Sequence, residues 1–273
     1  MQLPLWRNLL SPYELAVQEL VAKFNHIITE HKQHDLYPPI EFVSGRVKRI
    51  SSILEKMQRK NISFPRMEEE IEDIAGIRII CQFEEDIAVV AGIIAKRSDM
   101  EIKSEKDYLK NTKDSGYRSY HLIIYYVVET LEGPKKLQVE LQIRTLAMNF
   151  WATIEHSLQY KYKGSMPQKV SERLSKVSEA IMSLDKEMSE ARNDIMDAQY
   201  SRYEKSAVVA NILCSIENLF YVANKREVIK IQDEFLEIYD SGDFKRLQRF
   251  DQQLDLIAEG YRAQDLAMER HEE

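Results

Sequence analysis

Residues 137–144 read Leu-Gln-Val-Glu-Leu-Gln-Ile-Arg, and apolar and polar side chains alternate along this stretch without interruption. Alternation with a period of two is typical of a β-strand with one face in a hydrophobic core. The polar face holds one acid, two amides and one base, namely Gln138, Glu140, Gln142 and Arg144. Such a face is either exposed to solvent or forms the floor of a site, and the residues opposite Glu140 decide between the two.

Composition limits the class of protein, its partners and its location. With 273 residues and 44% hydrophobic content, the chain can bury one good core and carry an extension. A net charge of -7 argues against a general nucleic-acid coat, so nucleic acid is not a required partner. Cys81 and Cys214 lie far apart without a CxxC pair, which favours a reducing, cytoplasmic location. The sequence contains neither a secretion signal nor an apolar run of membrane-spanning length, so no membrane association is expected.

The remaining patterns predict a mixed α/β domain. A helix is expected over 11–33, with Ser11 as its N-cap and Pro12 at its first position. Further helices are predicted at 43–60, 67–73 and 85–97, and strands at 77–83, 100–104, 119–128 and 137–144.

Residues 170–200 carry a heptad pattern. The apolar positions are Val170, Leu174, Val177, Ile181, Leu184, Met188, Ala191, Ile195 and Ala198. They suit a long helix lying across its own domain or, as four heptads favour, a contact between subunits. Two or three amphipathic helices should follow residue 203, with a break at 241–243. We therefore expect a domain over 1–200 and a helical extension over 201–273.

A basic segment covers residues 44–60. Its cations are Arg46, Lys48, Arg49, Lys56, Arg59 and Lys60. A run of charges is usually a solvated helix face, but the hydroxyl of Ser52 would share one helix side with Lys48 and Arg59. Several cationic donors beside a small hydroxyl are suited to gripping a polyphosphate.

Two further segments combine charge with turn chemistry. Asp73 precedes a predicted strand at the Gly76 turn and is either a turn residue or a ligand, while Arg78 inside that strand calls for an anionic or planar partner. Residues 103–121 set Lys103, Lys106, Lys110, Lys113 and Arg118 around Gly116-Tyr117 and end at His121. Such a loop is either merely polar or able to stack a base and hold its phosphates.

The strand at 137–144 leads into a predicted helix. Asn149 and Glu155 on that helix are suited to reading the donor edge of a guanine, whereas Trp151 fits a core. Asp73 and Glu140, without a His or Cys ligand set, suit a hard cation, and we expect Mg²⁺ carried in by a nucleotide.

Four segments together carry a family resemblance: SGRVKRISSILEKMQRK, EDIAGIRIICQFEEDI, KDSGYRSYHLIIYY and VELQIRTLAMNFWATIEHSLQYKYKG. They resemble the synthetase domain of the RelA/SpoT homologues, most closely the small alarmone synthetases of the RelQ type, over about residues 11–200. The resemblance implies transfer of the β,γ-pyrophosphate of ATP to the 3′-hydroxyl of GDP or GTP. It also implies a nucleotidyltransferase-like α/β (α+β) fold with a mixed five-stranded sheet flanked by helices, and long C-terminal helices.

The resemblance also assigns roles to individual residues. Arg46 and Arg78 would sandwich the adenine, and the ATP phosphates would be held by Lys48, Ser52, Lys56 and Arg59. Asp73 and Glu140 would bind magnesium, and Glu140 would also take the proton of the 3′-hydroxyl. Tyr117 would stack on guanine, and the remaining acceptor residues would be Lys106, Lys113, His121, Gln142, Asn149 and Glu155.

The resemblance to the RelQ type also implies a homotetramer with a central cleft that binds pppGpp as an effector. Residues matching that cleft are Lys23, Glu41, Phe42, Ser44 and Asn149, whereas Val21 and Asn25 stand where the family has further lysines. Hydrolase activity is not expected, because His34-Asp35 is a lone His-Asp pair. Two alternatives remain: a relative that modifies the 3′ end of tRNA, and a silent nucleotide- or RNA-binding regulator.

Overall fold

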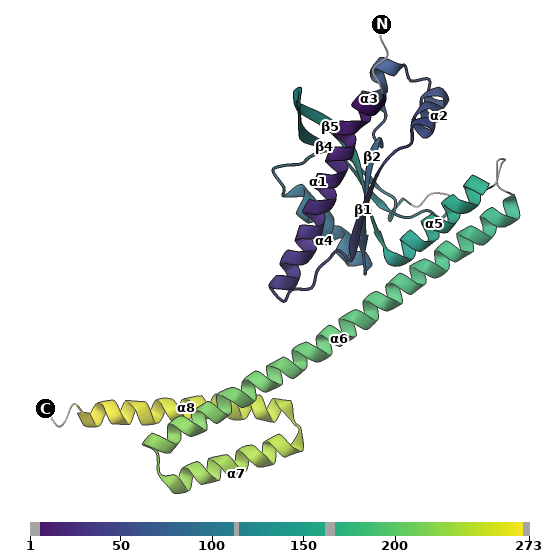
Figure 1. The fold of residues 1–273 in the computed structure, drawn as a ribbon. Coiled ribbons are helices and arrows are strands. Elements are labelled where there is room, and N and C mark those ends of the chain that lie inside the picture. The colour runs from purple at the N-terminus through teal and green to yellow at the C-terminus, as the bar shows by residue number, and fades with distance from the viewer. Residues whose placement is uncertain (1–5, 112–114, 162–166, 270–273) are drawn as a thin grey trace. The chain divides into compact units, whose positions relative to one another are not determined.

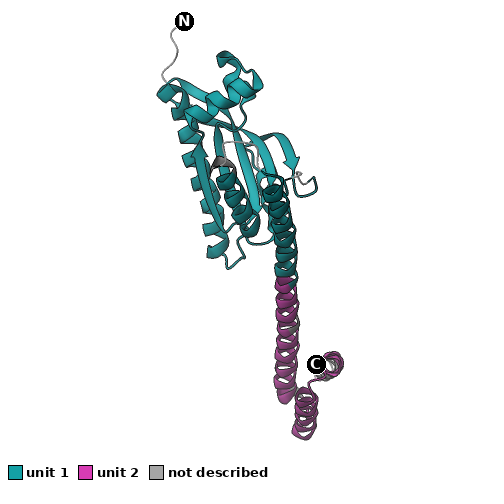
Figure 2. Cartoon of the chain, turned by 90° about the vertical axis from the view of Figure 1, so that its right-hand side faces the viewer, with its two compact units in different colours: residues 1–190 teal, residues 191–273 magenta. Residues whose placement is uncertain are grey.

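The computed structural model describes residues 6–111, 115–161 and 167–269. Its chain divides into two compact units, Met1–Glu190 and Ala191–Glu273 (Figure 2). Unit 1 holds the sheet, and unit 2 is helical.

The five strands of unit 1 form one mixed sheet (Figure 1). They are β1 (Phe42–Val47), β2 (Ala75–Cys81), β3 (Glu101–Asp107), β4 (Tyr120–Thr130) and β5 (Gly133–Thr145). Their spatial order is β1-β2-β5-β4-β3; β2 and β5 are parallel, and the other neighbours are antiparallel. The expected five-stranded mixed sheet is confirmed, and the segment that alternates at 137–144 lies within its central strand.

One face of the sheet is the apolar core. Leu137, Val139, Leu141 and Ile143 of β5 are all buried there. The helices α1 (Trp6–Gln33) and α4 (Glu84–Ala95) pack on this face through residues that include Leu20, Phe24, Ile87 and Val90. The polar residues of β5 consequently point to the opposite face.

The first helix begins earlier than its capping signals indicate. α1 starts at Trp6, so Ser11 is not its N-cap and Pro12 lies inside the helix. Leu10 is buried, and Trp6 makes an edge contact with Phe64 at a ring distance of 5.6 Å. This packing extends the helix past a position at which proline is normally unfavourable.

The segment 43–60 was predicted to be one helix, and this prediction is wrong. The segment forms β1 followed by α2 (Ile50–Lys60). A side chain at Gly45 would place its Cβ 2.6 Å from Val17 and 2.8 Å from Ile77, so β1 lies very close to α1. Farther on, the expected helix over 67–73 is only one turn long, α3 (Met67–Glu70), preceded by the 3₁₀ turn η1 (Phe64–Arg66).

After β5, the described residues form four helices: α5 (Leu146–Lys161), α6 (Gln168–Val222), α7 (Lys225–Ser241) and α8 (Phe244–Glu269). Leu174 and Ile181 of the heptad pattern are buried in unit 1, while Val177, Leu184 and Met188 are exposed. Unit 2 has its own core, formed by Ile212, Ile216, Leu219, Val228, Phe235, Ile238, Leu247, Phe250 and Leu254.

The expected break at 241–243 is confirmed, because α7 ends at Ser241 and its C-cap residue Gly242 has a φ of +72°. Among the described helices, none combines the length and apolar character required to cross a bilayer.

Candidate active site

A row of polar side chains crosses the whole sheet on the face away from α1. The strand registers pair Ser44 with Arg78, Arg78 with Gln142, Gln142 with His121 and His121 with Lys106. Each strand therefore contributes one residue to the row, in the order β1-β2-β5-β4-β3. Residues paired across neighbouring strands lie on the same face of a sheet. The row thus places residues predicted for the donor and for the acceptor on one continuous surface.

A cavity of about 250 Å³ opens over the β1 and β2 side of this surface. Its lining consists of Ser44, Gly45, Arg46, Lys48, Asp73, Gly76, Ile77, Arg78, Glu140 and Gln142. Three of the six residues predicted to hold ATP, Arg46, Lys48 and Arg78, and both predicted metal ligands thus border one space.

Arg78 lies in this cavity with unused hydrogen-bonding capacity. Its Nε is buried and has no hydrogen-bond partner among the described residues. Burial, together with the nearby positive charge of Arg46, lowers the pKa of Arg78. A buried donor without a partner is costly, so a ligand that supplies an acceptor or a planar electron-rich ring would stabilise this position.

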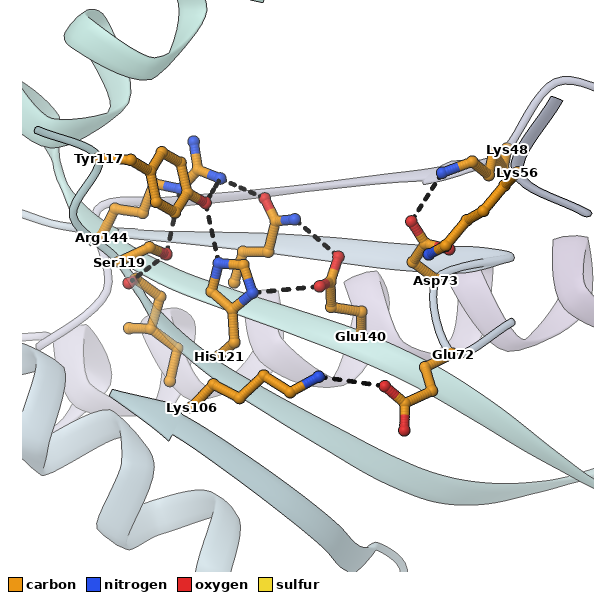
Figure 3. Close-up of polar contacts among 12 residues, drawn as sticks. Lys48, Lys56, Glu72, Asp73, Lys106, Tyr117, Ser119, His121, Glu140 and Arg144 are labelled. Carbon is orange, nitrogen blue, oxygen red and sulfur yellow. Dashed lines mark hydrogen bonds and ion pairs between the residues drawn. The ribbon is translucent and has the colours of Figure 1, made fainter. Parts of the chain in front are cut away.

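Asp73 is bound by two lysines at the cavity edge (Figure 3). Lys48 Nζ lies 2.6 Å from Oδ2, and Lys56 Nζ lies 2.7 Å from Oδ1. Burial raises the pKa of Asp73, but the two lysines outweigh burial and hold it below its ordinary value. Lys48 precedes α2 and meets Lys56 at Asp73, so its predicted place on one helix side with Ser52 and Arg59 is wrong, whereas Ser52 and Arg59 both lie on α2.

Glu140 stands at the centre of a hydrogen-bonded network on β4 and β5 (Figure 3). His121 Nδ1 lies 3.1 Å from Oε1, and Gln142 Nε2 donates to Oε2 at 2.7 Å. Burial raises the pKa of Glu140, but the hydrogen bonds from His121 and Gln142 outweigh it and lower the pKa below its ordinary value. Glu140 is therefore ionised at neutral pH, which is the form that a general base requires.

The network continues from His121 to Tyr117 and Arg144. Arg144 Nη2 donates to the hydroxyl of Tyr117 at 2.8 Å, and this hydroxyl lies 2.8 Å from His121 Nε2. Arg144 also donates to Gln142 and, through Nε, to Ser119 at 3.3 Å. All these bonds are satisfied when His121 carries its proton on Nδ1 and donates to Glu140.

Arg144 was not among the predicted site residues, although it shares the polar face of β5 with Glu140 and Gln142. Its guanidinium carbon lies 5.3 Å from the centroid of the Tyr117 ring. Because the side chain is buried, the role of Arg144 becomes visible only once the strands are assembled. The period-two spacing from Glu140 was the one local signal that could have identified it.

A third acid, Glu72, binds two lysines on the β3 side of the surface. Lys103 Nζ lies 3.0 Å from one of its oxygens and Lys106 Nζ 3.2 Å from the other. Lys103 also donates to Gln138 at 2.7 Å. The predicted phosphate ligand Lys106, the β3 member of the row, is thus held in place by a residue that was not among the predicted site residues.

Several predicted residues lie outside these contacts. Ser52 and Arg59 do not line the cavity, and Lys113 lies outside the described residues. Asn149 and Glu155 are both on α5, and Oδ1 of Asn149 is buried without a hydrogen-bond partner in the described chain.

The residues predicted for an effector cleft are spread over several elements. Lys23 pairs with Asp99 at 2.7 Å, and Glu41 accepts a hydrogen bond from Gln82 at 2.6 Å. Phe42 is exposed, and Ser44 belongs to the cavity described above.

The side chains at the cavity fit the expected magnesium chemistry. Asp73 and Glu140 line the same space, and no cluster of three or more potential His, Cys, Asp or Glu ligands occurs in the described residues. Mg²⁺ is commonly bound by one or two carboxylates together with substrate phosphates and water. Two carboxylates beside a cationic pocket match this pattern.

Comparisons with known proteins agree with the resemblance. Residues 45–165 match the model of a region found in RelA / SpoT proteins. The GTP pyrophosphokinase YjbM of Bacillus subtilis is 50% identical over 204 residues, which are 74% of this chain and 96% of that protein.

Solved structures give the same result. Small alarmone synthetase 1 of Bacillus subtilis bound to its product pppGpp matches with a TM-score of 0.68 and 51% identity, over 70% of this chain and 97% of that one. The same enzyme bound to AMPCPP matches with a TM-score of 0.62 and 47% identity, over 70% and 98%. The chain therefore belongs to the RelA/SpoT family, as one of its small alarmone synthetases.

Proposed function

We propose that this protein is a GTP pyrophosphokinase that transfers the β,γ-pyrophosphate of ATP to the 3′-hydroxyl of GDP or GTP, giving AMP and ppGpp or pppGpp. The proposal is supported by relatives named for this activity, which this chain matches over nearly their whole length. The observation that carries it is the row across the sheet, with the donor residue Arg78 on β2 and the acceptor residues His121 and Lys106 on β4 and β3. Glu140 lies on β5, the strand between them.

On the donor side, Arg46 and Arg78 would hold the adenine and Lys48 and Lys56 the phosphates, assisted by Ser52 and Arg59. The negative triphosphate would compete with Asp73 for the two ammonium groups. Asp73 would then be free to bind a cation together with Glu140. The nucleotide analogue bound by a close relative supports ATP as the donor.

On the acceptor side, Tyr117 would stack on guanine, as the resemblance implies. Support comes from its place beside the polar network: the Arg144 guanidinium carbon lies 5.3 Å from its ring centroid, and its hydroxyl lies 2.8 Å from His121 Nε2. Lys106, Lys113 and His121 would bind the acceptor phosphates. Gln142, Asn149 and Glu155 would contact its base or ribose, and the unpaired Oδ1 of Asn149 suits an amino or imino donor of guanine.

The reaction then needs placement and charge neutralisation more than covalent catalysis. Glu140 takes the proton of the 3′-hydroxyl as the oxygen bonds to the β-phosphorus. The bond from the β-phosphorus to the oxygen bridging the α-phosphate breaks, and AMP leaves with its electrons. Asp73 and Glu140 would hold Mg²⁺, which would supply neutralisation of the phosphate charge that develops in this step.

Incubation with ATP, magnesium and GDP tests the proposal. AMP and ppGpp should appear in equal amounts by anion-exchange chromatography, and label from γ-labelled ATP should enter ppGpp. Glu140→Gln is the matched control because it keeps the size of the side chain. Absence of both products from the folded wild-type protein, with an active relative in parallel, contradicts the proposed function.

We further propose the assembly and location that the resemblance implies. The synthetase would be residues 1–200, acting in the cytoplasm within a homotetramer, and residues 201–273 would be an extension. The expected pppGpp effector would contact Lys23, Glu41, Phe42, Ser44 and Asn149. Light scattering and binding of labelled pppGpp to wild type and Lys23→Ala test these points.

A further inference from the structure

The part of α6 within unit 1 meets the domain along a single line of residues. Leu174, Ser178, Ile181, Asp185 and Ser189 are all less than 10% exposed. They recur at intervals of three and four residues and so occupy one face of the helix. Three of them are polar, and each polar side chain bonds to a different element of unit 1.

Ser178 makes the closest of these contacts. Its Oγ donates a short hydrogen bond to the carbonyl oxygen of Gly116. Gly116 has a φ of +84°, and a Cβ at this position would lie 2.7 Å from the Cβ of Ser178. Only glycine at 116 and a small residue at 178 allow this approach. The helix backbone therefore lies directly against the turn that leads into Tyr117.

The same helix also supports the side chain of Tyr117. Trp151 Nε1 donates to the carbonyl oxygen of Leu174 at 2.9 Å, and the Trp151 ring lies 6.3 Å from the Tyr117 ring. Tyr117 packs against the small cluster formed by Trp151, Leu174 and Ile181. α6 thus contacts Tyr117 twice, through its backbone neighbour Gly116 and through this cluster.

The other end of Tyr117 belongs to the site. Its hydroxyl bonds to His121 and Arg144, and His121 bonds to Glu140. A displacement of Gly116 would therefore shift both the proposed stacking surface for guanine and the histidine that bonds to the proposed base. The polar side chains of this helix face bond to Gly116, Thr145 and Glu85, and none of these three residues lines the donor cavity.

We propose that Ser178 is a positioning residue for the acceptor half of the site: by fixing Gly116, it sets Tyr117 for the guanine nucleotide. Ser178 itself touches no substrate. This inference rests on the proposed function, since it assigns Tyr117 to the acceptor. It predicts that loss of the Ser178 hydroxyl weakens the binding of GDP or GTP and leaves the binding of ATP unchanged.

The chain offers a matched pair of variants. Ser178 and Ser189 are both buried on the same face of α6, and Ser189 donates to Glu85 on α4 at 2.8 Å, away from the acceptor loop. Ser178→Ala should raise the KM and the Kd for GDP about fivefold, the effect of one lost hydrogen bond, without changing the KM for ATP. Ser189→Ala should alter neither constant, although it removes a hydrogen bond of the same kind.

Calorimetric titration with GDP in the absence of ATP gives a readout that does not depend on turnover. Equal GDP affinity in Ser178→Ala and wild type overturns the inference, as does an equal loss in both variants or a matching rise in the KM for ATP. If the wild type binds GDP but forms no product, the proposed reaction fails while the role of Ser178 is still measured.

Hydrogen exchange on the wild-type protein covers the case in which Ser178→Ala does not fold. Coupling between two sites is reciprocal, so GDP bound at Tyr117 should slow amide exchange in residues 174–181. AMPCPP alone should not. Unchanged exchange in this segment at saturating GDP also overturns the inference.

Discussion

Burial raises the pKa of the Glu140 carboxyl group, whereas its hydrogen bonds lower it. The hydrogen bonds outweigh burial, so the pKa lies below its ordinary value. Glu140→Gln removes the proton acceptor but keeps a group that can bond to His121 and Gln142. We expect turnover to fall by about 10²- to 10⁴-fold, the usual contribution of a general base, with GDP affinity within a few-fold of wild type. Rapid-quench assays of AMP release together with calorimetry measure both, and turnover near the wild-type rate excludes Glu140 as the base.

Tyr117 has a ring and a hydroxyl with separable roles. Tyr117→Phe keeps the ring but loses the bonds to His121 and Arg144, so it should mainly lower kcat. Tyr117→Ala removes the ring and should mainly raise the KM for GDP, because stacking is worth about 1–3 kcal/mol per base, or roughly 5- to 150-fold. Steady-state kinetics with GDP varied at saturating ATP distinguish the two, and indistinguishable profiles contradict this division.

At the scale of elements, the contact between α6 and β5 contains a buried carboxyl group. Asp185 is 5% exposed and accepts a hydrogen bond from Thr145, at the end of β5, at 2.8 Å. Burial raises the pKa of Asp185 to about 6; the bond from Thr145 and the charge of Arg118 lower it, while Glu84 and Glu85 raise it further.

This raised pKa predicts how stability depends on pH. The native state holds a proton on Asp185 more tightly than the unfolded chain does. The contribution of Asp185 to the free energy of unfolding is therefore full below about pH 4 and is lost as pH rises to about 6. Asp185→Asn should therefore stabilise the protein progressively over that interval, by at most about 3 kcal/mol above pH 6. Chemical unfolding at pH 4, 5, 6 and 8 measures the difference, and a difference independent of pH contradicts the prediction.

Elements with strong local periodicity were predictable from sequence, and those shaped by packing were not. The alternation at 137–144 identified β5 and its polar face correctly. β1 was read as helix because Phe-Val-Ser-Gly-Arg-Val lacks alternation; it is an edge strand whose Gly45 is required by the close approach of α1. The early start of α1 likewise depends on the distant partner Phe64.

The site shows the same division. Glu140 and Gln142 were visible because they share one strand, and Asp73 because it lies just before a strand. Gly76, expected to supply the turn there, lies within β2, and the turn is formed by residues 72–74. Arg144, Glu72 and Ser178 gain their roles from partners that are 20 or more residues away, such as Tyr117, Lys106 and Gly116. No local pattern carries that information, since it depends on strand order and on how α6 packs.

For the whole molecule, the charge balance at Asp73 separates folding from activity. Lys48 and Lys56 already neutralise Asp73, so the fold does not depend on a metal to compensate this carboxylate. Addition of EDTA should abolish product formation and shift the melting temperature by less than about 2 °C, an effect well below that of losing a structural metal. Excess Mg²⁺ should restore activity, and cooperative unfolding on chelation would contradict the prediction.

The separate core of unit 2 leads to a test of the extension. Because its buried residues begin at Ile212, a chain ending at residue 202 should keep the sheet and the site intact. We expect product formation within a few-fold of the full chain. Circular dichroism serves as the folding control, and light scattering shows whether the subunit number changes. A folded but inactive shortened chain would assign the extension a part in the reaction.

The strand order has a consequence for biosynthesis. β5 is the last strand to leave the ribosome, yet it occupies the middle of the sheet between β2 and β4. Until residue 145 is available, the nascent chain can form only two separate hairpin-like halves, each with an unpaired inner edge. Insertion of β5 closes both edges and delivers Glu140 in the same event, so incomplete chains are inactive and are also the species most prone to aggregation.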